Sequence, residues 1–240
     1  MSVTLPRWHD LEFGAYQADL PYWRALAAQT GGPIVELGAG TGRVTHVLAA
    51  DGHRVIAVDS EGHLLAALRS RSLPATAITT VETDIQNLPE LPSFNLVIAP
   101  MLLLHLLAGA QQRIDLFKAL REQMSLGTQA VFAVSDPLPL EISEASAADS
   151  LKTLDLDGHH LETRLLASPE AGEVLRLVRE RRHFIGSELH ESVEELKLVE
   201  CRVELIINEA ATARLRFVDC QPVGSDASNG QIEMVRFEAI

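Results

Sequence analysis

The sequence predicts an α/β protein built on a mostly parallel sheet, and three observations indicate this class. Short runs rich in β-branched residues alternate with stretches of helical apolar spacing over the first two-thirds of the chain, as in a parallel sheet with crossover helices. A strand-like run leads into a loop with alternating glycines, Gly38, Gly40 and Gly42, at the start of a helical stretch. The chain has 240 residues, 47% of them hydrophobic, which suffices for the core of one domain.

Five strands and four helices are expected in this first part. The strands are short runs rich in β-branched residues and bounded by turn residues, at Pro33–Leu37, Arg54–Val58, Ala75–Val81, Phe94–Ala99 and Gln129–Val134. The helices have apolar residues at helical spacing, at Tyr16–Gln29, Gly42–Ala50, Glu61–Arg71 and Ala110–Met124.

The composition changes after Asp136-Pro137. Residues 138–160 are rich in Ser, Ala, Asp and Glu, and we expect a surface excursion there. Two long strand-like segments, Glu173–Phe184 and His190–Val203, flank a turn at Gly186-Ser187 and predict an antiparallel hairpin over the main domain. The remaining elements are expected to be a helix at Val203–Ala213, strands at Arg214–Cys220 and Ile232–Glu238, and a loop at Gly224–Gly230.

Charge and composition limit the partners. The formal net charge of −13 argues against nucleic acid, which is bound by clustered Lys and Arg. The one dense basic run, Arg176–Arg182, is expected to be the solvated face of a strand. No apolar run is long enough to span a bilayer and no signal peptide is evident, so a cytoplasmic protein without membrane contact is expected. The oligomeric state is expected to be monomer or homodimer.

Metal binding is not expected. Cys201 and Cys220 lack metal-ligand spacing and are interpreted as ordinary thiols of a reducing compartment. His159 and His160 are adjacent, and neighbouring side chains of a strand point to opposite faces, so this pair cannot chelate an ion.

The glycine loop distinguishes two classes of cofactor. The dinucleotide fingerprint G-x-G-x-x-G requires its third glycine at position 43, where this chain has Arg43. A bulky residue there crowds the helix–strand packing that the third glycine permits. This spacing disfavours an NAD-dependent oxidoreductase.

The run Glu36-Leu37-Gly38-Ala39-Gly40-Thr41-Gly42 resembles motif I of the class I S-adenosylmethionine-dependent methyltransferases. Further motifs follow in the family's order over residues 14–136. The chain opens with a lid helix that contains Tyr16, Asp19 and Tyr22-Trp23, and the strand ends Ala57-Val58-Asp59 and Glu82-Thr83-Asp84-Ile85 come next. Residues Phe94–Ala99 then resemble motif IV, with Asn95 in place of the more frequent Asp.

The resemblance implies a Rossmann-like class I methyltransferase fold, with a seven-stranded mostly parallel sheet, helices on both faces and the β-hairpin as a cover. It divides one domain, residues 1–240, into an N-terminal lid helix (1–32), a cofactor-binding core (33–136), an insertion and acceptor cover (137–203), and a closing helix and strands (204–240). It also implies that S-adenosylmethionine is bound, without a metal, and leaves as S-adenosylhomocysteine.

The resemblance assigns cofactor-binding residues too. Asp59 stands where relatives bind the ribose hydroxyls, and Asp84 where they accept a hydrogen bond from the adenine amino group. The whole set implied is Tyr16, Trp23, Glu36, Gly38, Ala39, Gly40, Thr41, Gly42, Arg43, Asp59, Ser60, Asp84, Ile85 and Pro100. For the aromatic residues ordinary helix packing is the alternative, and for Arg43 an exposed position on the helix surface.

A catalytic base is not required by methyl transfer, but His105 is a candidate. It follows the fourth expected strand, and an imidazole there can take a proton from a hydroxyl or ammonium acceptor. The alternative is a partly buried histidine on an apolar helix.

The acceptor is expected to be a small molecule methylated on N or O. The run Ala99-Pro100-Met101 differs from the Asn/Asp-Pro-Pro-Tyr/Phe run that is typical of methyltransferases acting on base amines. A protein or peptide methyltransferase and a non-catalytic S-adenosylmethionine-binding module are the alternatives.

Overall fold

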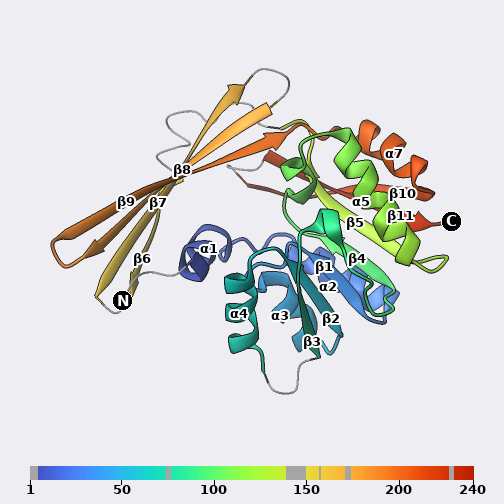
Figure 1. Cartoon of the computed structure of the whole chain (residues 1–240), viewed down its shortest axis with the longest axis horizontal. Helices are drawn as coiled ribbons and strands as arrows, with labels where there is room; N and C mark the ends of the chain where they lie inside the picture. Colours follow the sequence, from blue (N-terminus) through green and yellow to red (C-terminus); the bar gives the residue numbers. More distant parts are fainter. Residues whose placement is uncertain (1–4, 74–76, 139–149, 157, 171–173, 227–229) are drawn as a thin grey trace.

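A computed structural model describes residues 5–73, 77–138, 150–156, 158–170, 174–226 and 230–240. It has two sheets (Figure 1). Sheet A contains β1 (Ile34–Leu37), β2 (Val55–Asp59), β3 (Ile78–Glu82), β4 (Leu96–Ala99), β5 (Gln129–Ser135), β10 (Leu215–Asp226) and β11 (Gly230–Ala239). Sheet B contains β6 (Lys152–Leu156), β7 (His159–Glu170), β8 (Val174–Ile185) and β9 (Glu188–Val199).

The α-helices are α1 (Leu5–Phe13), α2 (Leu20–Thr30), α3 (Arg43–Ala50), α4 (Gly62–Arg71), α5 (Ala110–Gln123) and α7 (Val203–Thr212), with 3-10 turns η1 (Ile85–Asn87) and η2 (Leu103–Leu106). No helix of the described ranges is both long and apolar enough to cross a membrane.

Sheet A has the strand order β10-β11-β5-β4-β1-β2-β3. Strands β1 to β5 pair in parallel, and β11 pairs antiparallel with both β5 and β10. The seven-stranded, mostly parallel sheet that the sequence predicts is therefore confirmed.

Both faces of sheet A are covered because its central strands are apolar on both sides. On one face Phe132 packs against Phe117 of α5 in a cluster that also takes in Ile206 of α7. On the other face Trp23 of α2 and Leu48 of α3 pack against the sheet. This arrangement fixes the loops after β1, β2 and β4 at one edge, the carboxyl edge of the sheet.

Three expectations about the elements are wrong. The N-terminal part holds two helices, and the second begins only at Leu20, so Tyr16 lies before it. Residues 138–160 contain strand β6 and the start of β7 as well as a segment, 139–149, that lies outside the described residues. Strand β10 continues to Asp226, well into the expected loop at Gly224–Gly230, of which residues 227–229 lie outside the described residues.

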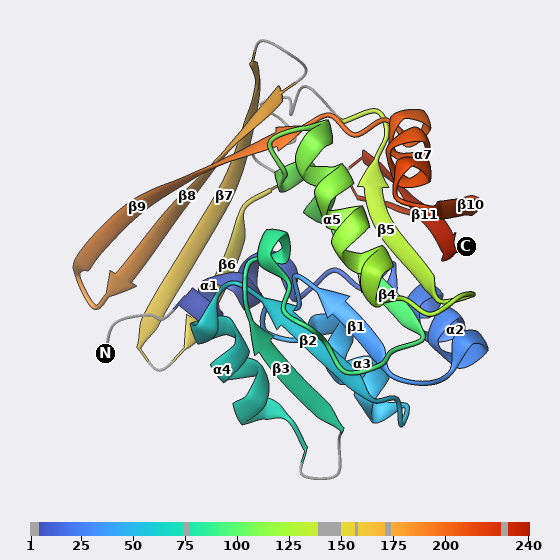
Figure 2. The ribbon, with the colours of Figure 1, turned by 45° about the vertical axis from the view of Figure 1, so that its right-hand side comes forward.

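Sheet B extends the expected hairpin. Strands β8 and β9 form that hairpin, and β7 and β6 add two further antiparallel strands. The long strands run from the neighbourhood of η2 and α5 toward α1 (Figure 2). Near η2, Leu138, Leu175 and Leu198 form a buried cluster against which Leu102, just after β4, packs. Sheet B is therefore attached beside the carboxyl edge of sheet A.

The basic run Arg176–Arg182 divides between the two faces of sheet B, because β8 side chains alternate. Arg176 and Arg182 face outward and pair with Glu195 and Glu191 of β9. Arg179 and Arg181 are largely buried on the opposite, inner face, which looks toward α1. The expectation of a single solvated face was wrong for these two.

Candidate cofactor and acceptor site

The glycine loop lies at the carboxyl edge of sheet A. Gly38, Gly40 and Gly42 have φ angles of 70°, 56° and 94°, in the region that favours glycine. A Cβ on Gly40 would lie 2.5 Å from ring atoms of His9, and one on Gly42 would lie 2.8 Å from Leu68. The loop therefore needs glycine for its conformation and for close packing.

Asp59 is held beside this loop. One carboxylate oxygen accepts a hydrogen bond from the Gly40 N–H at 2.7 Å, and the other accepts from the Glu61 N–H at 2.9 Å. The side chain therefore bridges the glycine loop and the start of α4. Ser60 follows it and is exposed.

Asp84 follows the neighbouring strand. Strands β2 and β3 are paired so that Asp59 lies opposite Glu82, which brings Asp84 to the same edge. Its carboxylate accepts a hydrogen bond from the Gln86 N–H at 2.9 Å, and Ile85 beside it is half-buried. The two predicted carboxylates thus lie at the carboxyl ends of adjacent strands.

Glu36 lies beneath the loop, in β1, and is only 2% exposed. The Thr45 hydroxyl donates a hydrogen bond of 2.5 Å to its carboxyl group. Burial raises the pKa of Glu36 to about 8, against the smaller opposing effects of that hydrogen bond and of the Arg43 guanidinium. The carboxyl group is therefore largely neutral at pH 7 in this structure.

Arg43 binds the segment that precedes α2. Its guanidinium forms a bidentate ion pair with Asp19, at 2.6 and 2.8 Å, and donates to the Tyr16 carbonyl at 2.9 Å. It also lies over the Tyr16 ring, 5.2 Å from the centroid. Arg43 is therefore not an exposed residue of the helix surface, and its guanidinium is already paired within the protein.

Trp23 does not reach the cofactor edge. Its side chain is 0% exposed in the core beneath sheet A, and its indole N–H donates to Asp19 at 2.9 Å. The structure therefore favours ordinary packing over a direct cofactor contact. Pro100 is also buried, at the end of β4, and the following Met101 has a φ of 62°.

The position of His105 does not suit a catalytic base. It is 0% exposed, and its Nε2 accepts a hydrogen bond from the Ser135 N–H at 3.1 Å. In the neutral ring Nδ1 then carries the proton, which it donates to the Val199 carbonyl at 2.9 Å. Burial lowers the pKa of His105 to about 4. Both nitrogens are occupied, so the expectation of proton transfer to this imidazole is not met.

Helix α1 is the part of the site that sequence reasoning missed. His9 Nδ1 lies 3.2 Å from the Thr41 hydroxyl, and its ring packs on Gly40. The available signal was the pair of helix boundary residues, Pro6 near the start and Gly14 just after the end.

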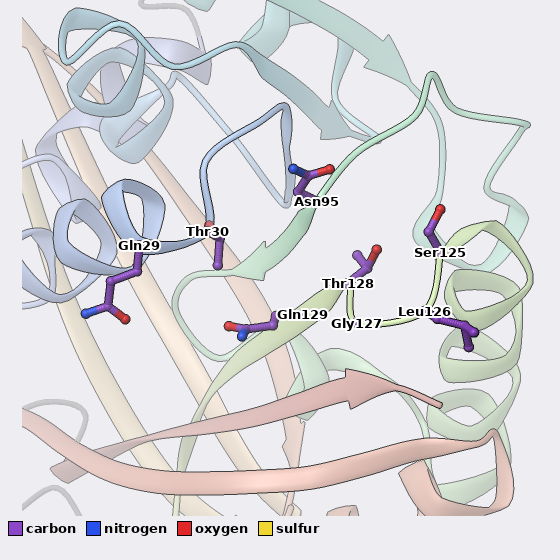
Figure 3. A pocket seen from close by; sticks show the side chains of 8 residues that line it. All are labelled: Gln29, Thr30, Asn95, Ser125, Leu126, Gly127, Thr128 and Gln129. Carbon is purple, nitrogen blue, oxygen red and sulfur yellow. The ribbon is translucent and has the colours of Figure 1, made fainter.

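The opposite, amino edge of sheet A has a pocket of about 410 Å³ (Figure 3). Its lining residues are Gln29, Thr30, Asn95, Ser125, Leu126, Gly127, Thr128 and Gln129. The lining contains no charged group, and it is separated from the glycine loop by the length of the sheet. Asn95 belongs to this edge, so its departure from the family's usual acid does not bear on the cofactor site.

No group of three or more His, Cys, Asp or Glu in the described part of the chain has a geometry suited to a metal ion. The carboxylates, the glycine cradle and the loop N–H groups fit instead a cofactor with a ribose diol, an adenine amine and an amino-acid portion.

Comparisons with known proteins agree with this geometry. A family described as "Methyltransferase domain" matches residues 34–125. No curated protein matches the sequence.

Three similar solved structures illustrate the fold. The sugar N-methyltransferase KedS8 from Streptoalloteichus sp. has 14% identity and a TM-score of 0.78, covering 98% of this chain and 93% of that chain. The amino pentose methyltransferase CalS10 from Micromonospora echinaspora has 13% identity and a TM-score of 0.73, covering 100% and 99%. An S-adenosylmethionine-dependent methyltransferase from Clostridium acetobutylicum has 15% identity and a TM-score of 0.70, covering 97% and 96%.

These structural likenesses extend the domain match to the fold of nearly the whole chain. The domain match over residues 34–125 shows that the chain carries a methyltransferase domain, and the structural likenesses show the fold of S-adenosylmethionine-dependent methyltransferases over nearly its whole length.

Proposed function

We propose that the protein methylates a nitrogen or oxygen atom of a small-molecule acceptor, held between the carboxyl edge of sheet A and the inner face of sheet B. One observation carries this proposal: sheet B is attached on two sides of that edge. At one side His105 joins the end of β9 to η2, and at the other Arg181 joins β8 to Glu12 of α1. A cover attached in this way suits an enclosed small ligand better than an extended polymer.

The cofactor would be held by residues of the glycine loop and the strand ends. We assign the ribose hydroxyls to Asp59 and the adenine amino group to Asp84, since both carboxylates lie at the carboxyl edge. Glu36, beneath the loop, is the acid nearest in sequence to the glycines and is assigned to the amino-acid portion. Gly38, Gly40 and their neighbours provide the close backbone approach.

S-adenosylmethionine supplies a methyl group on a positively charged sulfur, which is open to direct displacement. The protein's part is to align the acceptor with that methyl group and to exclude water, and alignment alone can contribute about 7–11 kcal/mol. The apolar cluster of Leu138, Leu175 and Leu198 provides a dry wall beside this edge.

A neutral amine is the acceptor group that this site favours. An amine already has the lone pair needed for attack, whereas a hydroxyl must first lose a proton. His105 cannot take that proton because its nitrogens are occupied. Two of the similar structures are described as a sugar N-methyltransferase and an amino pentose methyltransferase, which supports this preference.

The test is a product screen. The purified protein and S-adenosylmethionine are incubated with amino sugars, other small amines, matched hydroxyl analogues and a basic peptide, and methylated products are detected by mass spectrometry. We expect turnover with small amines and none with Asp59→Ala. Turnover with the peptide alone would refute the proposed acceptor class.

A further inference from the structure

Helix α1 contacts the glycine loop with one side chain. His9 packs on Gly40 and lies 3.2 Å from the Thr41 hydroxyl, so its imidazole fills the space directly in front of the loop backbone. Because the loop is where the cofactor's backbone contacts must form, His9 is part of the wall that any bound cofactor meets. Nothing in the motif pattern assigns a role to this residue.

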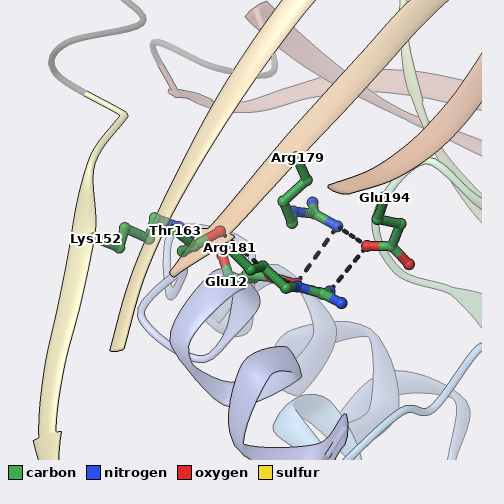
Figure 4. Close-up of polar contacts among 6 residues, drawn as sticks. All are labelled: Glu12, Lys152, Thr163, Arg179, Arg181 and Glu194. Atoms are coloured by element: carbon green, nitrogen blue, oxygen red, sulfur yellow. Dashed lines mark hydrogen bonds and ion pairs between the residues drawn. The ribbon is translucent and has the colours of Figure 1, made fainter. Parts of the chain in front are cut away.

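One turn further along, the same helix contacts sheet B. Glu12 is 6% exposed, and its carboxylate accepts two hydrogen bonds from Arg181, at 2.7 and 2.8 Å. Arg179 lies 3.4 Å from the same carboxylate, and the Thr163 hydroxyl donates to it at 3.3 Å (Figure 4). A carboxylate buried to this degree depends on its cationic partners.

The two arginines tie further groups into this contact. Glu194 of β9 pairs with both Arg179 and Arg181, at 3.1 and 2.8 Å. Arg181 also lies 5.5 Å from the centroid of the Trp8 ring, and Arg179 lies 4.9 Å from that of Phe13. One network of polar contacts therefore joins strands β7, β8 and β9 to α1. We name it the Glu12 network, and its members are Glu12, Thr163, Arg179, Arg181 and Glu194.

His9 and Glu12 are three residues apart on one short helix, so they move together. We propose that Glu12 is a positioning residue for the cofactor site: it fixes α1 to sheet B and thereby holds His9 against the glycine loop. Occupancy of the acceptor cover and occupancy of the cofactor loop are then coupled through α1. Only this last statement rests on the proposed function, because it takes sheet B as the acceptor cover.

The first test measures binding of S-adenosylhomocysteine by calorimetry, without an acceptor. Glu12→Gln keeps the side chain's size and removes its charge, and we expect affinity to fall by roughly fivefold or more. His9→Ala should weaken binding similarly, and the double variant should be no weaker than the weaker single variant. The matched control is Glu191→Gln, which breaks an exposed pair with Arg182 on the outer face and should leave affinity unchanged.

Melting temperature is measured on the same samples. A lower melting temperature for Glu12→Gln with unchanged affinity would overturn the proposal, since Glu12 would then serve stability alone. Additive losses in the double variant would also overturn it. If Glu12→Gln does not fold, Arg181→Lys replaces it: this change keeps the charge but loses the bidentate geometry, and unchanged affinity again counts against the proposal. These outcomes are independent of the acceptor screen, because no acceptor is present.

Discussion

Replacing Glu36 with glutamine should change how the stability of the protein depends on pH. The Glu36 carboxyl group is buried under the glycine loop, and its pKa is raised from 4.5 to about 8, chiefly by burial. Between these two pH values the native state holds a proton that the unfolded state has lost. Stability is therefore highest below the unfolded pKa and falls as pH rises toward the folded pKa.

The size of the effect follows from the shift. Each pH unit inside this window costs about 1.4 kcal/mol, so the wild-type protein loses about 3 kcal/mol between pH 4.5 and pH 7 through this group alone. Glutamine keeps nearly the same shape and does not ionise. The free energy of unfolding of Glu36→Gln should consequently rise relative to wild type with increasing pH, until the wild-type carboxyl is ionised near pH 8.

The assay is urea unfolding at pH 5, 6, 7 and 8, followed by tryptophan fluorescence. Glu90→Gln, which changes an exposed carboxylate, is the control and should differ from wild type by a nearly constant amount. If the difference in the free energy of unfolding between Glu36→Gln and wild type were also constant from pH 5 to pH 8, the conclusion that Glu36 is a buried, neutral carboxyl group would be refuted.

Three further changes test other parts of the structure. Glu209→Gln leaves the buried Arg113 guanidinium, now paired at 2.7 and 2.8 Å, without its counter-charge, and unfolding titrations should show a loss of about 3–5 kcal/mol. Asp59→Ala should weaken binding of S-adenosylhomocysteine by about tenfold or more in calorimetry, and it should also lower stability by about 1–3 kcal/mol because the Gly40 and Glu61 N–H groups lose their acceptor. Unaltered affinity would exclude its assigned role. His105→Gln should lower stability by about 1–3 kcal/mol, because its hydrogen bonds to the backbone are lost. The pH profile of the methylation rate should not change. If the variant lost an ionisation from that profile, His105 would be the catalytic base after all.

The parallel core could be predicted because its signals are local. Each of β1 to β5 is a short run rich in apolar or β-branched residues next to turn residues, and the glycine spacing marks where a strand meets a helix. Sheet B was only half predicted, because an exposed strand with charged residues on one face has the composition of a surface segment. Strand β6 pairs with β7 and β7 pairs with β8, and these contacts between strands are not visible in the composition of either segment alone.

The position of a side chain at the carboxyl edge could be predicted where a motif ends a strand, as for Asp59, but not where tertiary packing decides. Trp23 and His105 stand near the right motifs, but the packing around them turns both into buried residues. Helix α1 is nine residues long, too short to be indicated by periodicity, and helices of this length depend on tertiary contacts. Glu12 gains its importance only from arginines far along the chain.

The alternation of arginines in β8 has a consequence for insertions and deletions. Because side chains alternate along a strand, removing one residue between Leu177 and Arg179 would move every side chain on one side of the deletion to the opposite face of the sheet. Arg179 and Arg181 would then point to solvent, and Glu12 would be left without cations. The turn at Gly186, where β8 passes into β9, is exposed and can absorb length changes without that exchange. Among variants of this chain, insertions and deletions should therefore be tolerated at the hairpin tip. Within β8 they should destabilise the protein, even when the residues around them are unchanged.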